Sequence, residues 1–271
     1  MKRILVSLFG HHFVFQLADW RMTWFPNKLQ KKIKQNEAEA FRRRKLFYSS
    51  FIRKDDLCFD VGANIGNRIR PLLAIGSKVV AVEPQKNCYR FLQYKFGNKI
   101  KIVTKGLGEG GGIKDFHISD YSVISSFSDE WISAVKDGRF KGSTWSKTEK
   151  VEMTTLDHLI AEYGEPSFIK IDVEGYELEV LKGLTKPIKM VSFEYTVPEQ
   201  TNKAIDCIRQ IEKNNPNIEC NYGIGESMEL ASHLWLSAEK MKEFIFSKEF
   251  CDTGFGDVYV RTKESGKQLD S

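Results

Sequence analysis

Residues 57–66 limit the possible folds of this chain more than any other segment. Their sequence, LCFDVGANIG, is an apolar run that ends in Asp60 and enters a turn with two glycines. This pattern is typical of a buried strand followed by a glycine turn and a helix. A second apolar run ends in Glu83, seventeen residues after Gly66. Because an acid at the end of the second strand can accept hydrogen bonds from both ribose hydroxyls, the segments predict a site for an adenosine-containing molecule.

The residues of the turn distinguish between cofactors. Dinucleotide-binding turns have the pattern G-x-G-x-x-G, with the pyrophosphate at the N-terminus of the following helix. This chain has Asp60 before the first glycine, where a carboxylate would repel a pyrophosphate but would suit an amine or a cation. S-adenosyl-L-methionine has a sulfonium, an ammonium and a ribose, and is the predicted cofactor. The predicted cofactor turn is Asp60, Gly62, Asn64 and Gly66, and Glu83 is expected to hold the ribose.

A third buried-strand pattern, at 167–177, ends in two carboxylates and a glycine. Four segments in this order resemble the FkbM-type family of S-adenosylmethionine-dependent methyltransferases: DVGANIG at 60–66, VEP at 82–84, TLD at 155–157 and IKIDVEG at 169–175. The resemblance covers roughly residues 55–198. It implies a class I methyltransferase fold and O-methylation of hydroxyls, often on sugars or other natural products. Asn64 stands where many class I enzymes have glycine, but an asparagine at this position resembles the motif of this family.

Length and composition are those of a globular protein with one large core. The 271 residues are 41% hydrophobic and 28% charged, which is ordinary for such a protein. The net charge of +5 is unevenly distributed, since residues 1–54 contain thirteen Lys or Arg against three Asp or Glu. The remainder contains 28 against 33. The predicted catalytic part is therefore mildly acidic, and the basic residues belong to an N-terminal arm.

Cysteine usage and the apolar segments indicate a cytoplasmic protein. The five cysteines include no C-x-x-C pair, which argues against a zinc site and a disulfide framework and favours a reducing compartment. No apolar run approaches the length of a membrane span. The apolar start at 4–9 breaks at Gly10 and is followed by no small-residue cleavage site, so we do not expect secretion.

Strand and helix patterns alternate along most of the chain, which predicts a doubly wound α/β fold with a mostly parallel, seven-stranded, Rossmann-like sheet. The family resemblance adds an antiparallel last strand. The predicted units are a basic, aromatic-rich helical arm (1–53), a methyltransferase domain (54–262) and a flexible tail (263–271). Strands are predicted at 57–62, 78–83, 100–104, 167–173, 189–196, 217–222 and 256–262, and helices at 28–53, 65–74, 86–95, 156–163, 176–182, 199–213 and 237–247.

Residues 106–154 do not follow the alternation and are predicted to be an insertion. Its glycines mark turns around a hairpin that includes 113–118, and 129–140 is expected to be a short helix. An insertion near the strand ends could be a lid or an acceptor pocket, or a surface elaboration without a chemical role. The backbone at Gly106 and Leu107 is expected to contact the adenine.

Methyl transfer to an alcohol requires a base that accepts one proton. Three acids at predicted strand ends could act in this way: Glu174 ranks first, followed by Asp172 and Glu194. Asp172 could instead hold the methionine part of the cofactor. The three could also form a magnesium site, but strand-end acids are not specific for this and we expect no metal. Lys170 could pair with one of them, whereas Glu177 and Glu179 suit the first turns of a solvated helix.

The arm and the overall function leave alternatives open. The arm could lie on an anionic membrane face, which would make the protein peripheral to the inner face of a membrane, or bind nucleic acid, which the acidic domain disfavours. The default is that it packs on its own domain or on a partner subunit. The leading function is O-methylation of a sugar hydroxyl in a glycan or glycolipid, or of another natural product. The alternative is a catalytically inactive scaffold that works through the arm, while a nucleotide-dependent oxidoreductase is disfavoured by the missing G-x-G-x-x-G.

Overall fold

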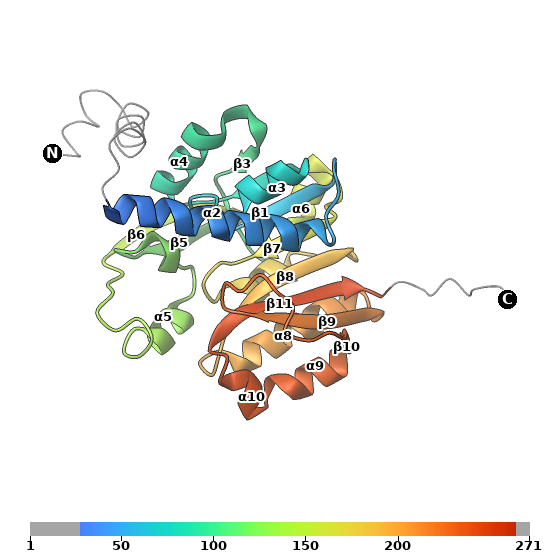
Figure 1. Cartoon of the computed structure of the whole chain (residues 1–271). Coiled ribbons are helices and arrows are strands. Elements are labelled where there is room, and N and C mark those ends of the chain that lie inside the picture. Colours follow the sequence, from blue (N-terminus) through green and yellow to red (C-terminus); the bar gives the residue numbers. More distant parts are fainter. Residues whose placement is uncertain (1–27, 264–271) are drawn as a thin grey trace, which may run out of the picture.

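The computed structural model describes residues 28–263, so the aromatic-rich start of the arm and all but the first residue of the predicted tail lie outside the described residues (Figure 1). An eight-stranded sheet forms the centre, in the order β10-β9-β11-β8-β7-β1-β2-β3. Its strands are β1 (Leu57–Val61), β2 (Lys78–Val82), β3 (Lys101–Val103), β7 (Phe168–Ile171), β8 (Met190–Thr196), β9 (Ile218–Ile224), β10 (Leu236–Ser237) and β11 (Phe255–Thr262).

Strand direction follows the prediction. The neighbours β3, β2, β1, β7 and β8 pair in parallel, and β11 pairs antiparallel with both β8 and β9. The doubly wound class I methyltransferase fold with an antiparallel last strand is thus confirmed. The predicted number of seven strands omitted β10, because two residues at a sheet edge give no periodic signal.

Helices cover both faces of the sheet and enclose two hydrophobic cores (Figure 1). One face packs against α2, α3 and α4, and the other against α6, α7, α8 and α9. The helices are α2 (Lys28–Ser49), α3 (Ile69–Ile75), α4 (Lys86–Phe96), α5 (Asp129–Val135), α6 (Leu156–Tyr163), α7 (Glu177–Lys182), α8 (Thr201–Asn214), α9 (Ala238–Ile245) and α10 (Lys248–Cys251).

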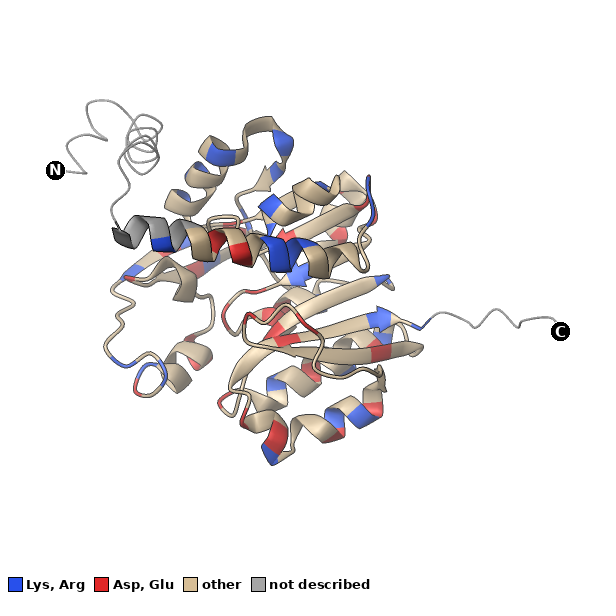
Figure 2. Ribbon diagram, viewed as in Figure 1, with Lys and Arg blue, Asp and Glu red and all other residues tan. Residues whose placement is uncertain are grey.

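Helix α2, the described part of the arm, packs on the domain itself. The aromatic rings of Phe47 and Tyr48 are buried in the core beside α3, and the Tyr48 ring lies 5.8 Å from that of Phe168 on β7. The basic residues Arg42 and Arg43 of this helix are exposed, and Lys and Arg positions recur along its length (Figure 2). Within the described part of the chain, no helix combines the length and the apolar character that crossing a membrane requires.

The insertion forms a second sheet of three strands, in the order β4-β6-β5. Strand β5 (Gly112–Ile118) confirms the predicted hairpin strand, but its antiparallel partner β6 (Lys147–Thr154) was not predicted. The first half of β6 carries Lys, Thr and Glu, and these polar residues hide the alternation. The short strand β4 (Gly106–Leu107) joins β6 in parallel. Helix α5 is shorter than predicted and begins at the side-chain cap of Ser128.

The helix predicted at 65–74 begins later, at Ile69. Asn64 and Gly66 have φ values of 45° and 77°, in the left-handed region that a right-handed helix cannot include. The turn after β1 is therefore longer than the pattern indicated. As a result, Asn67 and Arg68 belong to the turn and not to the helix.

Candidate active site

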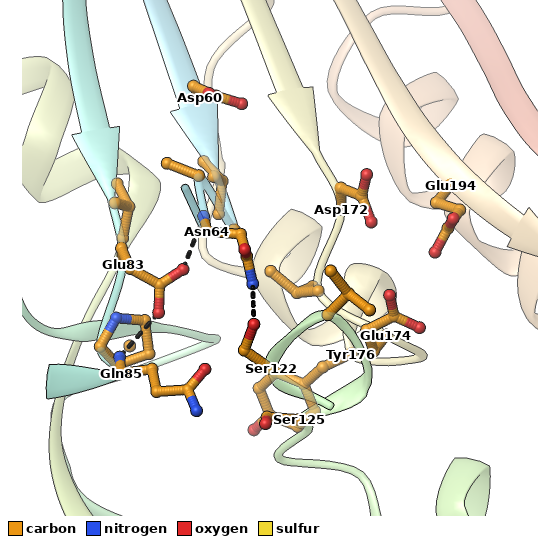
Figure 3. A pocket seen from close by; sticks show the side chains of 18 of the residues that line it. Asp60, Asn64, Glu83, Gln85, Ser122, Ser125, Asp172, Glu174, Tyr176 and Glu194 are labelled. Carbon is orange, nitrogen blue, oxygen red and sulfur yellow. Dashed lines mark hydrogen bonds between the residues drawn. The ribbon is translucent and has the colours of Figure 1, made fainter. Parts of the chain in front are cut away.

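A cavity that is partly open to solvent lies at the C-terminal ends of β1, β2, β7 and β8 (Figure 3). This is the edge of a parallel sheet where ligands bind in doubly wound folds. The insertion completes the wall with Phe116, Val123 and Phe127, among others. Of the predicted site residues, the cavity is lined by Asp60, Gly62, Asn64, Glu83, Leu107, Asp172, Glu174 and Glu194.

The glycine turn joins the two halves of the site. The backbone amides of Gly62 and Ala63 both donate to the carbonyl of Val82, at the end of β2. A Cβ atom on Gly62 would lie 1.8 Å from the carbonyl oxygen of Asp172, so only glycine allows the turn to dock against β7. Gly66 does not line the cavity. A Cβ there would lie 2.5 Å from the Phe96 ring, which gives this glycine a packing role.

Glu83 is held by backbone amides. Its Oε2 accepts from the N–H of Asn64 and its Oε1 from the N–H of Gln85, each at 2.7 Å (Figure 3). The side chain is buried, and this burial raises the pKa of Glu83 to about 7, although both amides favour the charged form. Each carboxylate oxygen keeps acceptor capacity towards the cavity, as a ribose diol requires.

Asp60 lies at the same edge, on β1. It is 2% exposed, and burial raises its pKa to about 6. Its Oδ2 is buried without a hydrogen-bond partner among the described residues, and so is Oδ1 of Asn64. Unpaired buried acceptors are costly unless a ligand satisfies them. Both residues line the cavity, so a bound donor group could satisfy these oxygens.

Three acids gather on the other side of the cavity. Asp172, Glu174 and Glu194 each offer an oxygen, and these oxygens all lie within 4.8 Å of one another. Glu174 occupies a turn with a φ of 55°, and its carbonyl accepts from the Ser126 hydroxyl at 2.7 Å. The insertion thereby holds the turn that presents this carboxylate.

The environments of these three acids separate their protonation states. Oδ2 of Asp172 lies 3.1 Å from Nη2 of Arg68 and 3.5 Å from Nζ of Lys170. Burial opposes its charge, but the two cations outweigh burial and hold the pKa of Asp172 below its ordinary value. Burial and the negative charge of Asp172 raise the pKa of Glu174 and of Glu194 well above the ordinary range. Asp172 is therefore the charged member, and the two glutamates are the members able to carry a proton.

Sequence comparison identifies the family. The sequence model of the methyltransferase FkbM domain matches residues 60–239, which include both halves of the site. The chain belongs to the FkbM methyltransferase family. It is also 31% identical over 143 residues to the hexuronic acid methyltransferase AglP of Haloferax volcanii. This match covers 52% of the chain, and the chain spans about half the length of that curated relative, 54%.

Solved structures with a similar fold include other methyltransferases. Magnesium protoporphyrin IX methyltransferase (ChlM) from Synechocystis, with bound SAM, matches at a TM-score of 0.43 and 10% identity, over 97% of each chain. A TehB-like SAM-dependent methyltransferase from Corynebacterium glutamicum matches at 0.43 and 9%, over 86% of this chain and all of the other. Likenesses this distant carry no argument about the chemistry of the FkbM-family site.

Several residues of this FkbM-family site escaped prediction from the sequence. Arg68 and Glu226 line the cavity and pair with each other at 3.2 Å. Nothing local indicates this contact, since 158 residues separate them. The interpretation of Glu177 as part of a solvated helix was wrong. It is 5% exposed and accepts from the amides of Val173 and Gly175, so it shapes the turn after β7.

The site geometry bears on two expectations from the sequence, the pairing of Lys170 with an acid and a magnesium site at the three clustered acids. Lys170 pairs with acids as expected, since its Nζ lies 2.5 Å from Oδ1 of Asp257 and also near Asp172. The three clustered acids are spaced closely enough to face a divalent cation. Arg68 and Lys170 already lie against Asp172, however, so part of the charge that such a cation would require is neutralised.

Proposed function

We propose that this protein is an S-adenosylmethionine-dependent O-methyltransferase that acts on a hydroxyl of a sugar, in a glycan or glycolipid. The observation that carries the proposal is that one cavity contains both acid groups. Asp60 and Glu83 lie at the ends of β1 and β2, and the acid cluster lies at the ends of β7 and β8. A cofactor held by the first group would face an acceptor beside the second.

The cofactor would be held mainly by side-chain oxygens that can still accept hydrogen bonds. Glu83 would accept from the ribose hydroxyls, Asp60 and Asn64 from the ammonium group, and Leu107 on β4 would lie against the adenine. Bound S-adenosylmethionine supplies a methyl group that its sulfonium already activates. The protein therefore has two tasks, to orient the acceptor hydroxyl and to accept its proton.

Glu174 is the proposed base. A raised pKa makes the deprotonated form of Glu174 a stronger base towards the proton of an alcohol. Glu194 could exchange that proton with Glu174 across the cluster. Asp172 is a weaker candidate, because its two cationic neighbours stabilise the charged form. The proposed role of Asp172 is to remain the negatively charged member of the cluster.

The sugar assignment rests on two supports. The curated relative from Haloferax volcanii is described as acting on a hexuronic acid. In addition, the insertion lines the cavity with Phe116 and Phe127, and the ring of Phe127 lies 5.5 Å from that of Tyr176. Aromatic surfaces of this kind suit the apolar faces of sugar rings.

Calorimetric titration tests the proposal. We expect the protein to bind S-adenosylmethionine and S-adenosylhomocysteine and not NAD. The Glu174→Gln variant should keep this affinity and lose most of the transfer to any acceptor found by screening sugar nucleotides and glycolipids. A folded protein that binds neither sulfur compound would overturn the proposal and favour the scaffold function. Full activity of Glu174→Gln would remove Glu174 as the base.

A further inference from the structure

The charges around the cavity are unbalanced. Among the described residues that line it, one side chain is a basic one, Arg68, and six are carboxylates: Asp60, Glu83, Asp172, Glu174, Glu194 and Glu226. The amino-acid end of the proposed cofactor carries an ammonium and a carboxylate. The acids provide several places for the ammonium. The carboxylate would be repelled by all of them, so it needs the single cation.

Arg68 is built to hold an anion at this position. It is the last residue of the glycine turn, and its side chain, which is 15% exposed, lines the cavity. One nitrogen, Nη2, contacts both Asp172 and Glu226, and Nε is buried without a hydrogen-bond partner among residues 28–263. The guanidinium group therefore has hydrogen-bonding capacity that the ligand-free protein does not use.

Glu226 differs from the other acids because it belongs to no strand end of the parallel part of the sheet. It follows Gly225, in the turn after β9, and its side chain is 49% exposed. Oε1 of Glu226 accepts from Arg68 at 3.2 Å, and Oε2 accepts from Arg44 of α2 at 3.0 Å. The half-exposed carboxylate of Glu226 thus contacts Arg68, the single cation lining the cavity. Arg44 can remain paired with Glu226 when a ligand binds Arg68.

We propose that Arg68 binds the carboxylate of the cofactor's amino-acid end and that Glu226 is an internal carboxylate that competes for Arg68 in the ligand-free protein. When the cofactor binds, Arg44 retains Glu226, so that the displaced carboxylate keeps a cationic partner. The inference rests on the proposed cofactor and assigns a part of its site that neither the sequence pattern nor the family match indicates.

A pair of ligands separates this role from a structural one. S-adenosylhomocysteine has the amino-acid end, whereas 5′-methylthioadenosine has the same adenosine and thioether without it. Calorimetry with both ligands would compare the wild type with Arg68→Met, Arg68→Lys and Glu226→Gln. Arg70→Met is the matched control, because Arg70 lies two residues further along, is exposed, and does not line the cavity.

We expect Arg68→Met to weaken S-adenosylhomocysteine binding about 10- to 100-fold, the usual range for a lost charge-assisted contact, and methylthioadenosine binding less than about twofold. Arg68→Lys should recover part of the loss. Glu226→Gln should strengthen S-adenosylhomocysteine binding by about two- to fivefold, because the competitor is gone. Arg70→Met should bind both ligands like the wild type.

The outcomes separate this inference from the proposed function. Equal losses for both ligands in Arg68→Met would show a structural role and overturn the inference, with the cofactor site left in place. If Arg68→Met does not fold, Glu226→Gln decides, and unchanged or weaker S-adenosylhomocysteine binding there would overturn the inference. Failure of the wild type to bind either ligand would overturn the proposed function and this inference together.

Discussion

The two acidic halves of the cavity compensate their charges in different ways. At the ends of β1 and β2, the carboxylate of Glu83 is met by two backbone amides, and Asp60 keeps an unpaired oxygen. At the ends of β7 and β8, Asp172 is met by the side chains of Arg68 and Lys170. In the first half the main chain compensates the charge, and in the second half charged side chains do so, one from the same strand (Lys170) and one from the distant glycine turn (Arg68).

This difference fits two different tasks. Backbone amides are fixed dipoles that leave a carboxylate free to accept further hydrogen bonds, which suits the binding of a neutral diol. Paired cations instead fix one member of a cluster as an anion, and this anion, together with burial, raises the pKa of its neighbours, which suits the handling of a proton. Both halves depend on the glycine turn, since it contacts each of them.

The variant Gly62→Ala should damage both halves at once. The added Cβ would lie 1.8 Å from the backbone of Asp172, and the φ of 83° disfavours any side chain. We expect a loss of about 4 kcal/mol in the free energy of unfolding, with loss of cofactor binding. Urea unfolding would measure it, with Gly110→Ala as the control, because no atom lies within 4 Å of a Cβ there. A small cost for Gly62→Ala would mean that the turn can separate from β7.

The variant Lys170→Met should damage mainly the half built on side-chain pairs. Lys170 is 1% exposed, and its loss leaves Asp257 without its cationic partner and Asp172 with Arg68 alone. We expect about 3 kcal/mol of destabilisation by urea unfolding. Adding Asp257→Asn should recover about half of it. A double variant no more stable than the single one would identify Asp172 as the partner that requires Lys170.

The halves also differ in how far the sequence predicts them. Asp60 and Glu83 follow from one local pattern, because a strand, a turn and the next strand fix their distance. Glu174 and Asp172 follow from a local motif as well, which also contains Lys170, but their protonation states depend in addition on Arg68 from the turn after β1. Glu226 reaches Arg68 through the loop after β9, whose Met228 packs in the same core as Ile69 of α3, and one sequence without its fold contains no signal for that contact.

Cofactor binding should depend on pH because Glu83 titrates near neutral pH. In the ligand-free protein the pKa of Glu83 is about 7, and accepting from ribose hydroxyls requires the charged form. Affinity for S-adenosylhomocysteine should therefore fall as the pH drops below about 7, by up to about tenfold per unit. Calorimetry between pH 5.5 and 8.5 would measure it, and Glu83→Gln should bind weakly with a flatter profile.

The raised pKa of Glu83 also affects the folding stability of the ligand-free protein, with the opposite dependence on pH. The pKa of Glu83 is higher in the folded protein than in the unfolded chain, where the ordinary value is 4.5. Its contribution is therefore complete below about pH 4.5 and is lost as the pH rises through about 7. The increase in melting temperature that the cofactor produces should consequently be larger at pH 8 than at pH 6, and equal increases would contradict this assignment.

The smallest effect is expected where the insertion contacts the glycine turn beside Glu83. The Asn64 side chain donates to the hydroxyl of Ser122 at 3.4 Å, a long hydrogen bond that ties the insertion to the glycine turn (Figure 3). Ser122→Ala should cost about 0.5 kcal/mol of unfolding free energy, because the bond is weak and part of its site faces the cavity. Cofactor affinity should change less than twofold, whereas the KM for a sugar acceptor should rise, since the insertion lines the acceptor side. If cofactor affinity falls instead and the KM stays constant, the contact serves the glycine turn and not the acceptor wall.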